Sequence, residues 1–177
     1  MNSLQNRIIR AAMLDVNLYE EVEADKKAMG QAMGVVVLSS VAAGVGLIEK
    51  GGLSGILPGT IASLFGWYVW AYLTYFIGTK FLPEPQTKAD HGELLRTIGF
   101  SSSPGLIRVL GFVPGLGGMV FFVASIWMLV AMVIAVRQAL DYTSTLRAIG
   151  VCVIGWAAQI IILMFLFSIF GNGQVSS

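Results

Sequence analysis

Residues 109–136 read VLGFVPGLGGMVFFVASIWMLVAMVIAV and contain no charged side chain. Three further stretches are equally free of charge: Ala28–Ile48, Gly51–Thr79 and Ala148–Ser177. A helix that crosses a membrane needs about 20 mainly apolar residues. The chain of 177 residues is 56% hydrophobic and only 12% charged, whereas soluble domains carry about 25% charged residues. The sequence therefore predicts an all-α, polytopic membrane protein.

The least regular part of the expected membrane region is GFSSSPGLIRVLGFVPGLGG (99–118). Pro104 lacks a backbone N–H, and its ring disfavours helix at the residue before it, so we expect a kink or a break near residues 101–104. The hydroxyls of Ser101, Ser102 and Ser103 can satisfy backbone groups that such a break frees. The 20 residues of the segment 94–113 could cross the membrane once, or they could enter it and return.

The distribution of basic residues favours a single crossing, because cytoplasmic loops carry an excess of Lys and Arg. With five spans and a cytoplasmic N-terminus, the inner side holds nine basic residues and the outer side only Lys50. A re-entrant third segment would move Arg137 and Arg147 outside. We therefore expect five transmembrane helices with a kinked or broken third helix and an external C-terminus. The expected spans are 28–48, 56–80, 94–113, 117–137 and 147–170.

Three parts are expected along the chain. Residues 1–27 form a cytoplasmic N-terminal segment, residues 28–170 form the five-helix membrane domain, and residues 171–177 form an external tail. In the first part, apolar residues at helical spacing share one face, with polar residues largely opposite: Leu4, Ile8, Ile9, Ala12 and Met13 against Gln5, Asn6, Arg7 and Arg10. This pattern predicts an amphipathic helix at the membrane interface.

Polar residues inside the spans are the candidates for a site. Arg108 is the one charged residue deep in a span, and no Asp or Glu is expected at its depth. It either snorkels to the outer headgroups or contacts a lipid phosphate or a carboxylate of a neighbouring subunit. Gln159, at the middle of span five, is expected to face the serines of span three, because polar groups in hydrocarbon seek each other. The candidate polar membrane site is Ser101, Ser102, Ser103, Pro104, Arg108 and Gln159.

Two interpretations of the third span remain open at this point. The proline either bends a packed helix, as is common in membranes, or divides a discontinuous helix that lines a binding site. A second candidate surface is a crowd of aromatic residues in span two: Trp67, Tyr68, Trp70 and Tyr72. Aromatic residues are enriched in the cores of protein interfaces, although they also face lipid.

The residues needed for common catalytic or metal chemistry are scarce. His91 and Cys152 are the single residues of their kinds and lie in different environments, so they cannot build a usual zinc site. There is no Gly-x-Ser-x-Gly motif. We therefore expect a protein that is not an enzyme, with no cofactor, no metal and no nucleic-acid partner.

The order of four stretches resembles the Yip (Ypt-interacting protein) family, in particular its short prokaryotic members. The stretches are NLYEEVEADKKAMGQA, GFSSSPGLIRVLGFVPGLGG, VASIWMLVAMVIAVRQAL and STLRAIGVCVIGW. The resemblance implies a five-span helical domain with a cytoplasmic N-terminus. Eukaryotic Yip proteins act in membrane traffic, bind prenylated small GTPases and usually carry a longer cytosolic N-terminal region. The short N-terminal segment here favours a prokaryotic plasma or inner membrane.

Three functions follow as hypotheses. The first is a scaffold or accessory subunit that binds other membrane protein subunits and lipid headgroups, or a second copy of itself. The second is a small-solute or ion transporter or channel that uses the broken third helix. The third is a trafficking adaptor, as in eukaryotic Yip proteins. A water-accessible pocket that reaches the middle of the bilayer would favour transport.

Overall fold

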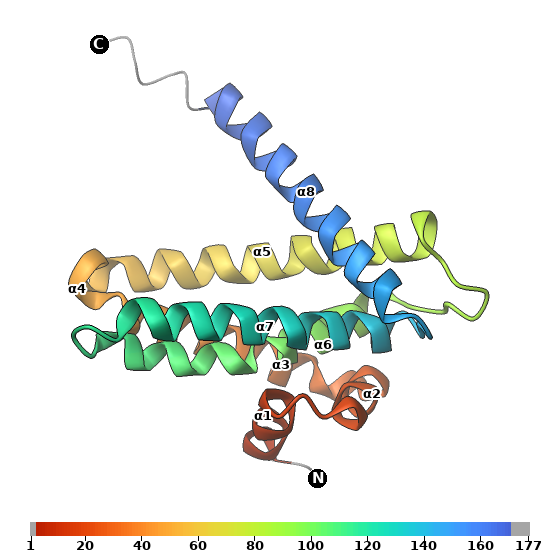
Figure 1. Ribbon diagram of the computed structural model, residues 1–177, viewed down its shortest axis with the longest axis horizontal. Helices are drawn as coiled ribbons and strands as arrows, with labels where there is room; N and C mark the ends of the chain where they lie inside the picture. The colour runs from red at the N-terminus through yellow and green to blue at the C-terminus, as the bar shows by residue number, and fades with distance from the viewer. Residues whose placement is uncertain (1–2, 171–177) are drawn as a thin grey trace.

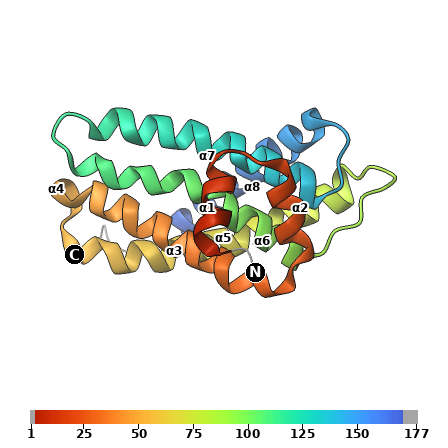
Figure 2. The same ribbon diagram turned by 90° about the horizontal axis from the view of Figure 1, so that it is seen from below.

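The computed structural model describes residues 3–170, and all regular elements in that range are helical (Figure 1). The bundle contains three long helices: α3 (Met29–Gly46), α5 (Ile56–Phe76) and α7 (Gly117–Ala139). Helices α3 and α5 lie side by side, and residues 91–112 lie between α3 and α7 (Figure 2). Short turns connect the long helices: η1 (Lys26–Ala28), α4 (Ile48–Gly51), η2 (Leu53–Gly55) and the π-helical η3 (Ile77–Phe81). The last helix, α8 (Thr145–Phe170), leaves the bundle at an angle (Figure 1). The expected tail at 171–177 lies outside the described residues.

Three helices of the described range are long and apolar enough to cross a membrane: Lys26–Gly46, Leu53–Phe81 and Gly117–Ala139. Thr145–Ile161 is a shorter apolar helix. The expected third span is divided between two elements, α6 (His91–Ser101) and the 3₁₀ helix η4 (Ser103–Phe112). Neither element has the length of a membrane span by itself. The divided third span and the shorter apolar helix Thr145–Ile161, in the place of the fifth, together make the difference between three and the five expected.

The change from α to 3₁₀ geometry lies beside the proline. The N–H of Ser102 bonds to the carbonyl oxygen of Gly99 at 3.2 Å, and the N–H of Gly105 bonds to that of Ser102 at 2.9 Å. Both bonds join residues three apart, as in a 3₁₀ helix. Pro104 has no N–H with which to continue the α-helical ladder.

The α6–η4 segment runs parallel to α3 at very close range. Small residues make this approach possible: added Cβ atoms at Gly99, Gly105 and Gly111 would meet Ala32, Ser39 and Gly46, respectively. Gly105 and Gly111 are two 3₁₀ turns apart, and Ser39 and Gly46 are about two α turns apart. The small residues of the two segments are therefore spaced so that they meet one another along the whole contact between α3 and α6–η4.

The centre of the molecule is α6, in which all eight residues from Leu94 to Ser101 are buried. One apolar cluster joins α6 to α5, α7 and the start of α8, and it includes Leu94, Ile98, Ala139, Leu140 and Val151. A second cluster joins α6, α3 and α7 to the N-terminal helices, and it includes Ala11, Leu18, Tyr19, Val22 and Phe100.

The N-terminal helices α1 (Leu4–Ala12) and α2 (Val16–Ala24) lie across the long helices (Figure 2). The indole N–H of Trp127, halfway along α7, donates to the carbonyl oxygen of Ala12 at 2.8 Å. Helix α1 therefore docks on the flank of the bundle. The sequence places Arg7 on a polar outer face, but Arg7 is only 7% exposed, whereas Met13 is 67% exposed. Arg7 is buried because it pairs with acidic residues of α2 and its C-terminal end, as described below.

Candidate functional site

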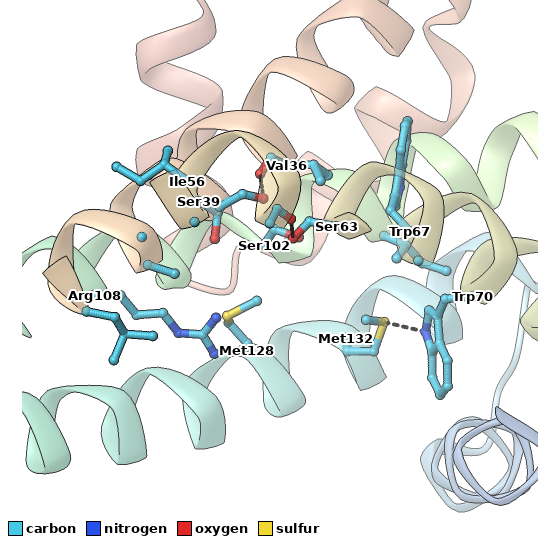
Figure 3. A pocket seen from close by; sticks show the side chains of 18 of the residues that line it. Val36, Ser39, Ile56, Ser63, Trp67, Trp70, Ser102, Arg108, Met128 and Met132 are labelled. Atoms are coloured by element: carbon cyan, nitrogen blue, oxygen red, sulfur yellow. Dashed lines mark hydrogen bonds between the residues drawn. The ribbon is translucent and has the colours of Figure 1, made fainter. Parts of the chain in front are cut away.

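A cavity of about 480 Å³ lies between α3, α5, the α6–η4 segment and α7 (Figure 3). The polar residues that line it are Ser39, Ser40, Ser63, Ser102, Arg108 and Gln159. Its apolar wall includes Trp67, Trp70, Met128 and Met132. Gly59 and Ser63 of α5 border the cavity and are themselves exposed, so the cavity opens to the surface. We call it the groove.

The structure brings together three of the six candidate site residues, since Ser102, Arg108 and Gln159 all line the groove. The other three, Ser101, Ser103 and Pro104, are buried beside it. The Ser101 hydroxyl donates to the carbonyl oxygen of Ile98 at 2.7 Å. The hydroxyl oxygen of Ser103 is buried without a hydrogen-bond partner in the described part of the chain. Gln159 makes no hydrogen bond to these serines there.

Arg108 is half-buried at the end of the groove formed by η4. Its Nη2 donates to the hydroxyl of Ser125 at 3.3 Å, and its guanidinium lies 5.6 Å from the ring centroid of Phe121. Its Nε is buried and has no hydrogen-bond partner. In residues 3–170, no carboxylate lies within ion-pair distance of it. The guanidinium therefore has donors that its own described chain does not use.

The four aromatic residues proposed as an interface divide into two pairs. Trp67 and Trp70 point inward: the Trp67 indole donates to the carbonyl oxygen of Leu95 at 3.0 Å, and the Trp70 indole lies 3.2 Å from the sulfur of Met132. Tyr68 and Tyr72 are 54% and 53% exposed. Their rings meet His91 edge-on, with centroids 5.0 and 5.8 Å away.

A second cavity, of about 450 Å³, lies between α5, α7 and α8. It shares Trp70, Met132 and Gln159 with the groove, so the two cavities adjoin. Its other lining residues are mainly apolar: Leu129, Val133, Ile149, Cys152, Val153 and Trp156. The groove, which polar residues line along its length, thus adjoins a mainly apolar cavity at Trp70, Met132 and Gln159.

An ionic network holds the N-terminal helices in place, and the sequence pattern did not indicate it. Arg7 donates to Glu21 at 2.9 Å, to Asp25 at 2.8 Å and to Gln31 at 2.8 Å. Arg10 pairs with Glu21 at 2.6 Å. The partners lie 11 to 24 residues from these arginines, beyond the reach of helical periodicity. The many charged residues in 1–27 were the one feature of the sequence that could have indicated such a network.

Buried Arg96 completes the attachment of α2. Its guanidinium donates to the carbonyl oxygens of Val22 and Glu23, at the end of α2. The last carbonyls of a helix have no partner within the helix, and a cation there also suits the helix dipole. Arg96 therefore anchors α2 to α6.

Four carboxylates line a hollow of about 550 Å³ between α2, α6 and the end of α7: Glu20, Glu23, Glu93 and Asp141. Burial, together with the charges of Asp141, Glu93 and Glu20, raises the pKa of Glu23 to about 7. The amide of Gln138 donates to Glu20 at 2.8 Å. Among the described residues, no group of three His, Cys, Asp or Glu side chains is placed to hold a metal ion.

Buried Glu84 ties together the two loops at this end of the bundle, 82–90 and 140–144. Its carboxylate accepts from the backbone N–H of Thr143 at 2.9 Å and from the Thr143 hydroxyl at 2.8 Å. These bonds lower the pKa of Glu84. The hydroxyl of Tyr142 donates to the carbonyl oxygens of Gly78 and Leu82. We call this end, with its two loops, the basic end, because Lys80, Lys88, Arg137 and Arg147 surround it.

Long apolar helices around a buried α6, with one cation in a groove between them, define a helical integral membrane protein. The model of the Yip1 domain family matches residues 21–167, and the chain belongs to that family. The match covers the end of α2, all of α3, α5, α6, η4 and α7, and most of α8. No curated protein and no solved structure matches the chain.

Proposed function

We propose that the protein is a non-catalytic scaffold, an accessory subunit of a larger membrane protein complex. The observation that supports this role is the departure of α8 from the bundle (Figure 1). Ala148 and Val151 pack against the bundle, but Trp156 is 66% exposed and Met164 is 65% exposed. Lipid can cover such a helix, yet a large aromatic residue on a diverging helix is also a typical anchor for a second membrane protein.

The proposal includes five crossings with the N-terminus in the cytoplasm of a prokaryote. The chain alternates between the two ends of the bundle along α3, α5, α6–η4, α7 and α8 (Figure 1). The α6–η4 segment is about 36 Å long, because a 3₁₀ helix rises about 2.0 Å per residue, and the hydrocarbon core is about 30 Å thick. It can therefore act as a broken third span. The basic end would face the cytoplasm.

A photo-cross-linking residue at position 156 tests the scaffold role. Phe122 on α7 is the matched control, because it is also aromatic, apolar and 66% exposed. We expect position 156 to cross-link one protein species at fixed stoichiometry and position 122 to cross-link lipid. Native mass spectrometry should show the same species lost from Trp156→Ala and kept in Phe122→Ala. If the protein cross-linked at position 156 is a second copy of the chain, the complex is a homo-oligomer.

The groove supports a second candidate, a small-solute transporter. It reaches the depth of Ser39 and Ser102, near the middle of α3 and at the α6–η4 junction, and it contains Arg108 and Gln159. Transport would require the groove to open alternately toward the two ends. A purified monomer that moves a solute across liposomes, with the flux abolished in Gln159→Leu, would establish transport and contradict the scaffold role.

A further inference from the structure

Arg108 is the exception among the six arginines of the chain. Arg7, Arg10 and Arg147 meet carboxylates, and Arg96 and Arg137 donate to main-chain carbonyl oxygens. Arg108 has only the long bond to Ser125 and the face of Phe121, and its buried Nε has no partner. A guanidinium has five N–H donors in a planar fork that matches phosphate and carboxylate. The groove therefore presents an unsatisfied anion-binding group.

The position of Arg108 in the bilayer limits what the anion can be. It lies four residues before the end of η4, about 8 Å from the end of the bundle opposite the basic end. A side chain of this length reaches the headgroup region from that depth. The anion at Arg108 therefore lies where lipid phosphates lie.

The shape of the groove selects a molecule with an apolar tail. Along α5 the groove extends from Ile56 to Trp70, about 21 Å, whereas one leaflet of hydrocarbon is about 15 Å deep. Met128 lies beside Arg108, and farther along the groove the walls include Met132, Trp67 and Trp70 (Figure 3). The adjoining cavity is mainly apolar. An acidic side chain of another protein could pair with Arg108 but would leave the rest of the groove along α5 unfilled.

We propose that the groove binds one phospholipid of the outer leaflet, with its phosphate on Arg108 and one acyl chain along α5 toward Trp70. The hydroxyls of Ser39 and Ser40 lie along the path, and Ser40 already donates to the carbonyl oxygen of Val36 at 2.7 Å. The inference rests on the placement of the helices in a bilayer and is independent of the scaffold role. A lipid bound here would fill the space between α5 and α7.

The chain offers two different variants that should abolish binding. Arg108→Leu removes the phosphate contact. Gly66→Leu fills the groove without a clash, because Gly66 lines the groove and nothing lies within 4 Å of the position of an added Cβ. Gly34→Leu is the matched control, since Gly34 is equally unhindered but lies outside the lining. Lys88→Leu, at the basic end, controls for the loss of a positive charge.

Native mass spectrometry of the purified chain with added phosphatidylglycerol tests the proposal. We expect one lipid per chain to be retained, with retention at least tenfold lower in Arg108→Leu and in Gly66→Leu and within twofold of the parent in both controls. Arg108→Lys should retain an intermediate amount. Diacylglycerol with the same acyl chains, which has no phosphate, should bind at least tenfold more weakly than phosphatidylglycerol.

Three results would overturn the proposal. One is undiminished retention of phosphatidylglycerol in Arg108→Leu. Another is equal binding of diacylglycerol, which would make the groove merely apolar. The third is full displacement by millimolar inorganic phosphate, which would indicate a site for a free anion. Size-exclusion profiles of the variants show whether each is folded.

Discussion

A single residue, Glu23, is expected to make the attachment of the N-terminal helices sensitive to pH. It lies at the end of α2, where Arg96 holds its main-chain carbonyl and three other carboxylates line the same hollow. Burial and the neighbouring negative charges raise its pKa to about 7, above the ordinary value of 4.5. Asp25 behaves oppositely, because its hydrogen bond to Arg7 lowers its pKa. Glu23 therefore titrates near neutrality, whereas Asp25 stays ionised there.

We predict that α2 docks more tightly at pH 5 than at pH 8. A raised pKa means that the docked state holds the proton more firmly than the undocked state. The stabilisation is complete below about 4.5 and is lost as the pH rises to about 7. Limited proteolysis of residues 1–27 should therefore accelerate between pH 5 and pH 8. Glu23→Gln should remove this dependence, and Glu49→Gln, on the opposite end, should keep it. An unchanged dependence in Glu23→Gln would exclude Glu23 as the titrating group.

Among the elements, α1 is held in place partly by a contact with a residue far away in the chain. Its last residue, Ala12, accepts the hydrogen bond from Trp127 on α7. Its buried residues are Arg7 and Ala11, and Ile9 is 50% exposed. The helix is therefore attached by the ion pairs of Arg7 and Arg10, by apolar contacts around Ala11 and by one indole N–H.

We predict that Trp127→Phe loosens α1 while leaving the bundle intact. The change keeps an aromatic ring and removes the N–H donor, and a hydrogen bond of this kind contributes about 0.5–1.5 kcal/mol. Hydrogen exchange in α1 should quicken by roughly two- to tenfold. Trp156→Phe is the control, because Trp156 donates no hydrogen bond to a residue that the structure describes. Equal exchange in the two variants would mean that the indole bond does not hold α1.

At the scale of the whole molecule, the chain passes repeatedly between a basic end and an opposite end (Figure 1). The loops 82–90 and 140–144 meet through Glu84 at the first end. The turns around α4 and residues 113–116 lie at the other. Orientation in the membrane then follows if the basic end faces the cytoplasm.

We predict that cysteines at the two ends differ in accessibility from outside the cell. In a Cys152→Ser background, an impermeant maleimide should label cysteines introduced at Ser54, Leu116 and Ser177 in intact cells. A cysteine at Lys88 should react only after permeabilisation. If the α6–η4 segment entered the membrane and returned, Leu116 would instead react together with Lys88.

The sequence could indicate the apolar helices, because charge-free runs need no knowledge of distant partners. It could also single out the region of Pro104, because proline acts on its own backbone. The docking of α1 and α2 could not be foreseen, since Arg7, Arg96 and Trp127 bind groups far away in the chain. For the same reason, the division of the aromatic residues of α5 into inward tryptophans and exposed tyrosines depends on α6 and α7. The groove likewise arises from five elements whose relative placement no local pattern specifies.

The contact between Ala12 and Trp127 has a consequence for how the protein is made. The two residues are 115 positions apart, and a ribosome adds about 5–20 residues per second. The N-terminal helices therefore emerge about 6–23 seconds before their docking surface on α7 exists. During that interval Arg7 can pair with α2 but cannot be covered by the bundle. Closure of the N-terminal helices is consequently a late event in biogenesis, and their docking distinguishes a chain in which α7 is in place from one in which α7 has not yet been made.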